Sequence, residues 1–448
     1  MIIDTIVAPA TNIAQQALAI IRVSGIDAFN IINQLLKKPL KKQRSVNFCD
    51  IIYQDRLLDQ VVITTFIAPK SFTGEDTIEI NCHGGVLVTK QILEAIINAG
   101  ARMALPGEFS QRAFLNNKIN LLQAEAINDL ITAKNLFASQ LAVRNMSKKN
   151  NIGVKNIKVK LLDIISRIQT SIDYPEYDDI DGSSNEELLN SIDELSKIIK
   201  TIIFKSRLAN QSVSGIQTAL VGSTNVGKSS ILNCLLNEDK AIVSSEAGTT
   251  RDLVEGEISF ANFTLKLIDT AGIRSTENKI ESIGIQKSYQ VLKEADLVIF
   301  VLDAQSLKFQ DEFLTELKDK TVITVVNKSE ILTNQEKQVI LKKNPEIVFC
   351  SAINNEIDEL INKIKDKYDH GEVIKSDDLV LSNIYHISLL SKVENKIEIA
   401  YNNFKSGYPV DIINVDLYEA WDNLNVLLGE SYDEEIIDNI FRKYCLGK

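Results

Sequence analysis

The chain has 448 residues, of which 45% are hydrophobic and 24% are charged, as in an ordinary globular protein. Its length predicts about three domains, and its composition excludes a wholly disordered or collagen-like chain. There are 49 lysine and arginine residues against 60 aspartate and glutamate residues, so the net charge is −11. This acidic total argues against a protein that coats nucleic acid, whereas a local basic patch can still bind RNA phosphates.

Cysteine usage and hydropathy narrow the cellular setting. The five cysteines lie far apart and form no C-x-x-C pair, so neither a disulfide framework nor a zinc site is expected. No stretch reaches the roughly 18 apolar residues of a membrane span, and the first residues do not resemble a signal peptide. We expect a soluble, cytoplasmic protein that does not enter a membrane.

Residues 1–117 mix short strands with turn signals. Residues 17–25 and 60–69 are apolar and β-branched runs typical of strands, and residues 76–85 form a strand that enters a glycine turn. Residues 88–100 have helical spacing and end at a glycine. These features predict an α+β domain.

Two further segments, 118–212 and 372–448, have helical periodicity, and we assign them to one helical domain in two parts. Residues 171–187 hold seven acidic residues and no basic one, together with Pro175 and Gly182, which favours a solvated loop between helices. The sequence contains no long internal repeat.

Between the helical parts, residues 213–371 alternate helices with near-continuous apolar runs such as "ADLVIFVLD". Strands that are buried on both faces of a parallel sheet have this composition. The predicted fold class is therefore multidomain α+β and α/β: an α+β N-terminal domain, a helical domain, and an inserted, doubly wound P-loop domain.

The segment "GSTNVGKS" (222–229) fits the pattern G-x-x-x-x-G-K-S/T and follows a predicted strand. Gly222 and Gly227 allow the backbone N–H groups to face phosphate oxygens. Lys228 is expected to reach the β and γ phosphates, which makes it a catalytic candidate, and Ser229 is expected to bind magnesium.

Four further motifs follow in the order found in GTPases. "GTTRD" (248–252) supplies Thr250 as a second magnesium ligand, and "DTAG" (269–272) offers a carboxylate and a backbone N–H near the γ-phosphate. "NKSE" (327–330) and "SA" (351–352) are expected to read guanine.

The predicted nucleotide-binding residues come from these five motifs and from the segment before "GTTRD". They are Asn225, Val226, Gly227, Lys228, Ser229, Ser230, Ser244, Ser245, Glu246, Ala247, Gly248, Thr249, Thr250, Asp269, Thr270, Ala271, Gly272, Asn327, Lys328, Glu330, Ser351 and Ala352.

The guanine motif departs from the usual N-K-x-D because Glu330 replaces aspartate. The longer side chain keeps both acceptor oxygens and displaces them by one methylene, so we expect guanine preference with weaker affinity. The alternative is that Glu330 faces solvent and selectivity is relaxed.

The chain resembles the MnmE (TrmE) family of tRNA-modification GTPases over nearly its whole length. Besides the nucleotide motifs, the resemblance rests on "DTIVAPAT" (4–11), "IIRVSG" (20–25), "SFTGEDTIEINCHGG" (71–85), "RMALPGEFSQRAFLNNKINLLQAEAINDLI" (102–131) and "YCLGK" (444–448). Residues 12–17, "NIAQQA", replace the glycine- and arginine-containing segment usual in the family.

The resemblance implies an N-terminal domain that binds folate and forms a homodimer, and G domains that associate during hydrolysis. It implies a flavoprotein partner, MnmG, in a heterotetramer that adds an aminomethyl or carboxymethylaminomethyl group to carbon 5 of the wobble uridine of tRNA. The implied cofactors are GTP, Mg²⁺, K⁺ and 5-formyl- or methylene-tetrahydrofolate.

The resemblance also implies roles for individual residues. The implied folate contacts are Arg22, Glu79, Lys118 and Lys448. The implied potassium ligands are Asn225, Ser244, Glu246 and Thr249, and the implied magnesium ligands are Ser229 and Thr250. Glu281 is the implied catalytic glutamate that positions water; by its position alone it equally fits a surface residue at a helix start.

Cys445 lies in the terminal motif and has two interpretations. Its thiol is a possible nucleophile toward a uracil ring, or it packs the C-terminal tail as a small apolar side chain. A regulatory ribosome-assembly GTPase that binds RNA without modifying it is the alternative function for the whole chain.

Overall fold

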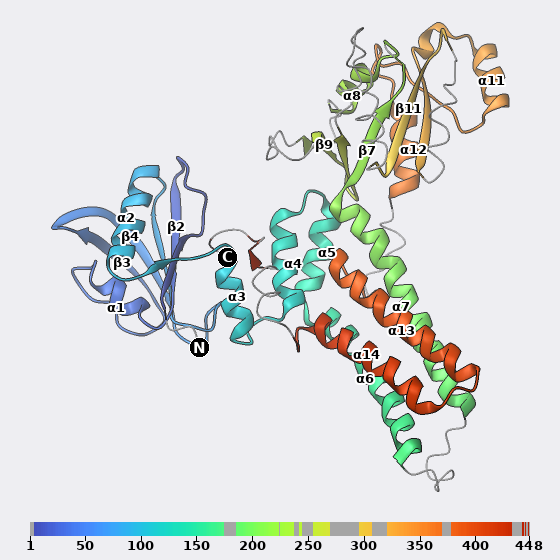
Figure 1. Ribbon diagram of the computed structural model, residues 1–448. Helices are drawn as coiled ribbons and strands as arrows, with labels where there is room; N and C mark the ends of the chain where they lie inside the picture. Colours follow the sequence, from blue (N-terminus) through green and yellow to red (C-terminus); the bar gives the residue numbers. More distant parts are fainter. Residues whose placement is uncertain are drawn as a thin grey trace, which may run out of the picture. The chain divides into compact units, whose positions relative to one another are not determined.

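A computed structural model describes residues 4–173, 185–223, 225–236, 242–243, 254–268, 295–306, 320–369, 378–431, 441–442, 444 and 447. The chain forms two compact units (Figure 1). The first comprises Met1–Asn128, Asn145–Lys158 and Trp421–Lys448, and the second comprises Asp129–Arg144 and Val159–Ala420.

The strands of the chain form two sheets, the first from β1–β6 and the second from β7–β13. The described strands are β1 (Ile6–Pro9), β2 (Leu18–Ser24), β3 (Ser45–Tyr53), β4 (Arg56–Phe66), β5 (Thr77–His83), β6 (Arg102–Met103), β7 (Ile216–Val221), β8 (Ile242–Val243), β9 (Val254–Ser259), β10 (Thr264–Ile268), β11 (Leu297–Asp303), β12 (Thr321–Asn327) and β13 (Val348–Phe349).

The described helices are α1 (Ala28–Asn33), α2 (Val86–Asn98), α3 (Glu108–Leu115), α4 (Leu121–Thr132), α5 (Leu136–Met146), α6 (Lys148–Asp173), α7 (Asn185–Ser214), α8 (Lys228–Leu236), η2 (Ser329–Ile331), α11 (Asn334–Lys343), α12 (Asp358–Tyr368), α13 (Ile384–Lys405) and α14 (Val410–Leu428).

The first unit contains a six-stranded sheet in the order β3-β4-β5-β2-β1-β6. Its strands are antiparallel except for the β1–β6 pair. Alternate side chains of β2, such as Ile21 and Val23, are buried in a core with residues of α1 and α2. Because successive side chains of a strand point to opposite faces, Arg22 lies on the face opposite this core.

A buried arginine joins three parts of the first unit. The guanidinium of Arg112 on α3 is 1% exposed; its nitrogens lie 2.7 Å from Asp4 Oδ1, 3.2 Å from Glu75 Oε1 and 3.0 Å from Glu108 Oε1. Burial would raise the pKa of Glu108, and hydrogen bonds from Arg102, the Leu105 N–H and Arg112 overcome that effect and lower the pKa.

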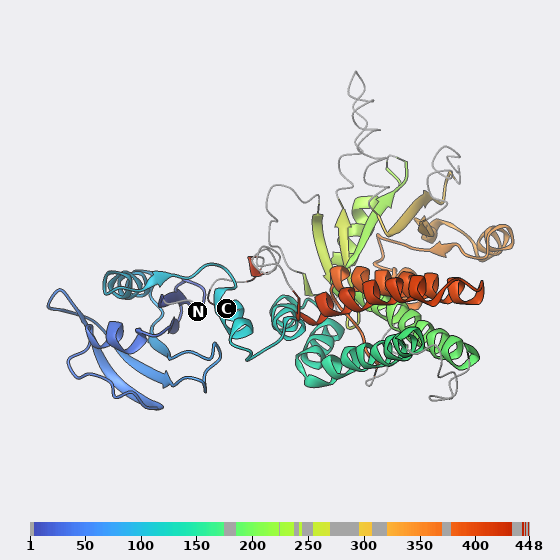
Figure 2. The ribbon, with the colours of Figure 1, turned by 60° about the horizontal axis from the view of Figure 1, so that its bottom comes forward.

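The second unit combines helices with a seven-stranded sheet in the order β13-β12-β11-β7-β10-β9-β8 (Figure 2). The five strands from β13 to β10 are parallel, and β9 and β8 form an antiparallel edge. In β11, Leu297, Ile299 and Val301 pack in one core, and Val298 and Phe300 pack in another on the opposite face. This two-sided burial explains the continuous apolar runs.

One long helix, α7, precedes the inserted sheet in the sequence, and another, α13, follows it. α7 ends at Ser214, directly before β7, and α13 runs along α7 (Figures 1 and 2). The ammonium of Lys200 lies 3.1 Å from Glu394 Oε1 across this contact, and that of Lys205 lies 2.7 Å from Asp378 Oδ1, in the segment before α13. None of the described helices combines the length and apolarity needed to cross a membrane.

The predicted fold class is confirmed, and several boundaries differ. The strands predicted at 17–25, 60–69 and 76–85 correspond to β2, β4 and β5, and the helix predicted at 88–100 is α2. The ends of the loop predicted at 171–187 are helical, because α6 continues to Asp173 and α7 begins at Asn185; residues 174–184 lie outside the described residues. The division into residues 1–117, 118–212, 213–371 and 372–448 stays a prediction.

We predict that Arg112→Leu lowers the free energy of unfolding of the first unit by about 3–5 kcal/mol, because it removes a buried guanidinium that hydrogen-bonds the buried Glu108 and the half-buried Glu75. Urea unfolding followed by the fluorescence of Trp421, the one tryptophan of the chain, measures this change. Glu108 has a lowered pKa in the folded state, so its stabilising contribution is present above its ordinary pKa and is lost as pH falls. The difference between wild type and variant therefore shrinks in acid.

The matched control is Lys37→Ala, which breaks an exposed ion pair with Asp50. Exposed pairs contribute at most about 1 kcal/mol, so this change should leave the unfolding curve nearly unaltered. Equal effects of the two substitutions would show that the buried network is not a major source of stability.

Candidate nucleotide site

The P-loop is shaped by two glycines that leave no room for a side chain. A Cβ on Gly222 would lie 2.2 Å from the carbonyl oxygen of Val301 on β11. A Cβ on Gly227, whose φ is +93°, would lie 2.2 Å from Asn327 Nδ2. The loop therefore packs directly against the ends of β11 and β12.

α8 begins at Lys228, so the first turn of a helix follows the loop. Backbone N–H groups at a helix N-terminus favour phosphate. The ammonium of Lys228 donates to the carbonyl oxygens of Gly222 at 2.8 Å and Ser223 at 2.7 Å, and burial lowers its pKa. Ser229 and Ser230 are exposed on this first turn, so both hydroxyls are accessible to a ligand.

Asn327 joins the P-loop to the loop that follows β13. Its side chain is 2% exposed; Nδ2 donates to the Val226 carbonyl at 2.9 Å, and Oδ1 accepts from the Ala352 N–H at 3.2 Å. Three motifs that lie far apart in the sequence are thus hydrogen-bonded to one another. This is the arrangement expected if they bind one ligand.

Lys328 makes a second connection to the P-loop. Its ammonium lies 2.6 Å from Asp303 Oδ2 and donates to the Asn225 carbonyl at 3.1 Å. Burial would raise the pKa of Asp303, and hydrogen bonds from Lys328 and the Gln305 N–H lower it overall. Asp303 was missed by the sequence analysis; the available signal was a carboxylate ending the strand that pairs with β12, opposite Asn327.

The remaining guanine-motif residues lie at the same edge of the sheet. Glu330 is exposed on η2, and the N–H of Ser329 donates to the Cys350 carbonyl at 3.0 Å, which holds η2 against the end of β13. Ser351 is fully buried, and its hydroxyl has no hydrogen-bond partner among the described residues. The structure therefore brings the P-loop, "NKSE" and "SA" together.

The other predicted nucleotide residues lie outside the described residues. These are Ser244–Thr250, Asp269–Gly272 and the proposed catalytic Glu281. The described strand β10 is parallel to β7 and ends at Ile268, so the second segment starts at the sheet edge that carries the P-loop.

Two of the predicted folate residues form a pair on the face of the six-stranded sheet opposite the core with α1 and α2. Arg22 and Glu79 are cross-strand neighbours, with Arg22 Nη2 2.8 Å from Glu79 Oε1. Arg22 also donates to the carbonyl of Gly447 at 3.1 Å, and its guanidinium lies 5.7 Å from the ring centroid of Phe109. The C-terminal tail thus reaches this face.

Lys118, the third predicted folate residue, is hydrogen-bonded to the Pro69 carbonyl at 2.7 Å and is exposed. It makes no contact with Arg22 or Glu79. Lys448 and Cys445 lie outside the described residues.

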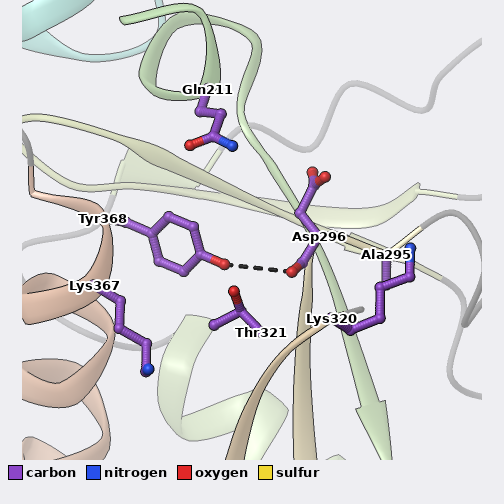
Figure 3. A pocket seen from close by; sticks show the side chains of 7 residues that line it. All are labelled: Gln211, Ala295, Asp296, Lys320, Thr321, Lys367 and Tyr368. Carbon is purple, nitrogen blue, oxygen red and sulfur yellow. Dashed lines mark hydrogen bonds between the residues drawn. The ribbon is translucent and has the colours of Figure 1, made fainter. Parts of the chain in front are cut away.

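A separate hollow of about 370 Å³ lies at the opposite edge of the parallel sheet (Figure 3). Its lining contains acidic, basic and uncharged side chains: Gln211, Ala295, Asp296, Lys320, Thr321, Lys367 and Tyr368. The Tyr368 hydroxyl donates to the Asp296 carbonyl at 3.4 Å. Because it lies where β11 and β12 begin, this hollow is distinct from the nucleotide site.

Comparison with protein families gives two matches. The family profile described as "MnmE helical domain" matches residues 121–445, and the profile described as "GTP-binding protein TrmE N-terminus" matches residues 5–118. Together they account for most of the chain.

Individual relatives match over the full length. A protein of Mycoplasma mycoides subsp. mycoides named tRNA modification GTPase MnmE is 53% identical over 451 residues, which is 100% of each chain. A protein of Mesoplasma florum with the same name is 52% identical and covers 99% of each chain. Among solved structures, Era of Aquifex aeolicus bound to GDP·AlF4⁻ is 31% identical and covers 40% of this chain and 65% of that chain, with a TM-score of 0.28.

We predict that Gly222→Ala lowers affinity for a fluorescent GDP analogue at least tenfold, because the new Cβ would meet a carbonyl oxygen that β11 holds in place. Equilibrium titration measures the affinity. Gly256→Ala in β9 is the control, since a Cβ there meets only side-chain atoms, the nearest at 3.3 Å. Undiminished affinity in Gly222→Ala would contradict the assignment of this loop as the phosphate site.

Proposed function

The chain belongs to the MnmE family of tRNA modification GTPases, and we propose that it hydrolyses GTP to drive modification of the wobble uridine of tRNA. The observation that carries the proposal is the convergence of the P-loop, "NKSE" and "SA" through the buried amide of Asn327. The family supplies tRNA as the substrate class.

Guanine would be read at the edge formed by β12 and β13. The exposed carboxylate of Glu330 can accept the N1–H and the amino group of guanine, and the neighbouring backbone N–H groups can donate to its carbonyl oxygen. Adenine offers no matching pair of N–H donors. The exposed carboxylate of Glu330 is accessible to guanine, and its exposure alone does not distinguish guanine recognition from a solvated side chain.

The phosphates would lie across the P-loop and the first turn of α8. Lys228 would exchange its two carbonyl contacts for phosphate oxygens, and Ser229 would bind magnesium together with Thr250. Magnesium prefers hard oxygen ligands and neutralises the charge that develops on the phosphates. The exposed hydroxyl of Ser229 at a helix N-terminus fits that requirement.

We further propose that hydrolysis is activated by potassium bound to Asn225, Ser244, Glu246 and Thr249. A cation there supplies positive charge near the bond between the β and γ phosphates, as an arginine does in other GTPases. The side chain of Asn225 is exposed and makes no hydrogen bond to another described residue, so its amide oxygen is available. Glu281 is proposed to orient the attacking water.

A reduced folate, either 5-formyl- or methylene-tetrahydrofolate, is proposed as the one-carbon donor. Arg22, Glu79, Lys118 and Lys448 are the proposed contacts. A partly exposed arginine and carboxylate suit this ligand, because its glutamate tail is anionic and its pterin ring presents N–H donors. Cys445 is proposed to pack the tail that approaches Arg22.

The proposed assembly is a homodimer that joins the flavoprotein MnmG in a heterotetramer and acts on tRNA in the cytoplasm. Dimerisation through the N-terminal unit and association of G domains during hydrolysis follow from the family resemblance. Exposed apolar side chains such as Val46 and Phe48 lie on β3, which pairs with β4. This exposed apolar surface supports dimerisation through the N-terminal unit.

We predict that deletion of this gene removes the 5-substituted wobble uridine from tRNA and that the wild-type gene restores it. Nucleoside mass spectrometry of total tRNA measures both results. A Lys228→Ala gene should fail to restore the nucleoside. An unaltered nucleoside profile after deletion would favour the alternative, a ribosome-assembly GTPase that binds RNA without modifying it.

We predict that potassium raises the GTP hydrolysis rate at least tenfold over sodium and that Asn225→Gly abolishes the difference. Glycine is the appropriate replacement because residue 225 has a φ of +64°, which alanine adopts at a cost of about 1 kcal/mol. Initial rates at matched ionic strength measure the effect. Equal wild-type rates in the two salts would exclude the potassium site.

A further inference from the structure

The β9–β10 hairpin connects the two segments proposed to sense the γ-phosphate. Residues 244–250 precede β9, and residues 269–272 follow β10 directly. β10 pairs with both β7 and β9, so it also links the hairpin to the strand that leads into the P-loop. The placement of this hairpin therefore determines where both sensing segments are anchored.

Residues from outside the inserted sheet hold this hairpin at three points. On β9, Lys134 Nζ lies 2.7 Å from Glu257 Oε1. At the turn, the Phe137 N–H donates to the Ala261 carbonyl at 3.1 Å. On β10, Asn135 contacts Thr264.

Asn135 is the buried member of the three. Its side chain is 8% exposed; Nδ2 donates to the Ser212 carbonyl at 2.8 Å and to Thr264 Oγ1 at 3.1 Å. Its Oδ1 accepts from the Ala138 N–H at 2.8 Å, in the first turn of α5. One amide thus joins the start of α5, the last turn of α7 and the start of β10.

The three contacts differ in energetic weight. The Lys134 side chain is 47% exposed, so water and salt screen its ion pair, which contributes at most about 1 kcal/mol. A buried amide that loses a partner leaves a polar group unsatisfied, which costs more than an exposed contact. Thr264 Oγ1 also lies 3.3 Å from Ser259 Oγ on β9, so Asn135 reaches both strands of the hairpin.

We infer that Asn135 is a positioning residue for GTP hydrolysis. The inference rests on the proposed function. No hydrogen bond joins Asn135 to the described residues of the P-loop or the guanine motif; it fixes the start of β10 against α5 and α7, and β10 ends at Ile268, directly before the proposed γ-phosphate-sensing segment that begins at Asp269. A displacement of about 1 Å at a catalytic group can slow a reaction by about a hundredfold, so a remote anchor of this kind affects turnover more than nucleotide binding.

The test compares turnover with affinity in the full-length chain. In potassium and saturating GTP, Asn135→Ala should lower kcat at least tenfold, while the Kd for fluorescent GDP changes by less than twofold. GDP binding depends on the P-loop and the guanine motif, which Asn135 does not contact. Gln140→Ala is the matched control, since Gln140 is exposed on α5, the helix that begins directly after Asn135.

Thr264→Val removes the acceptor on β10 and keeps the side-chain volume, so it tests the same contact if Asn135→Ala fails to fold. The double variant should lose no more turnover than the Asn135→Ala variant, because both changes break one contact. An intact kcat in folded Asn135→Ala or Thr264→Val overturns the inference, as does an equal loss of kcat and GDP affinity. Absence of GTP hydrolysis in the wild type would instead remove the proposed function, and the inference with it.

Discussion

The nucleotide site depends on one buried amide, that of Asn327. It supplies a donor to the P-loop at Val226 and an acceptor to the loop after β13 at Ala352, so two loops take their positions from one side chain. The contact also explains Gly227, since the amide occupies the volume that a Cβ would need. Because a buried amide without partners is costly, any shift of one loop is opposed by the other two elements.

The sequence predicted the parts of this site that are locally determined. Strands such as β11 are continuous apolar runs because both of their faces are buried. The P-loop can be identified from its sequence because glycine is required where the backbone approaches Val301 and Asn327. Asp303 was not predicted, because its partner Lys328 becomes a neighbour only through the register of β11 with β12. The antiparallel edge of β9 and β8 was missed for the same reason: strand direction is a property of the sheet.

The proposed folate site is a harder case for sequence reasoning. Arg22 and Glu79 are charged residues in strands of alternating polar and apolar residues, and only the pairing of β2 with β5 makes them an ion pair. The contact between Arg22 and Gly447 joins residues at nearly opposite ends of the chain. No periodicity or spacing predicts such a contact; the family resemblance was the only guide to these residues.

The insertion of the sheet between α7 and α13 affects how the protein can fold during synthesis. The two helices share one interface, with buried residues such as Ile199 on α7 and Val393 on α13. α7 leaves the ribosome first, and the whole nucleotide-binding insertion must be translated before its partner helix appears. The part of the apolar face of α7 that α13 covers therefore stays exposed while the sheet folds, which makes the nascent chain at this stage prone to aggregation.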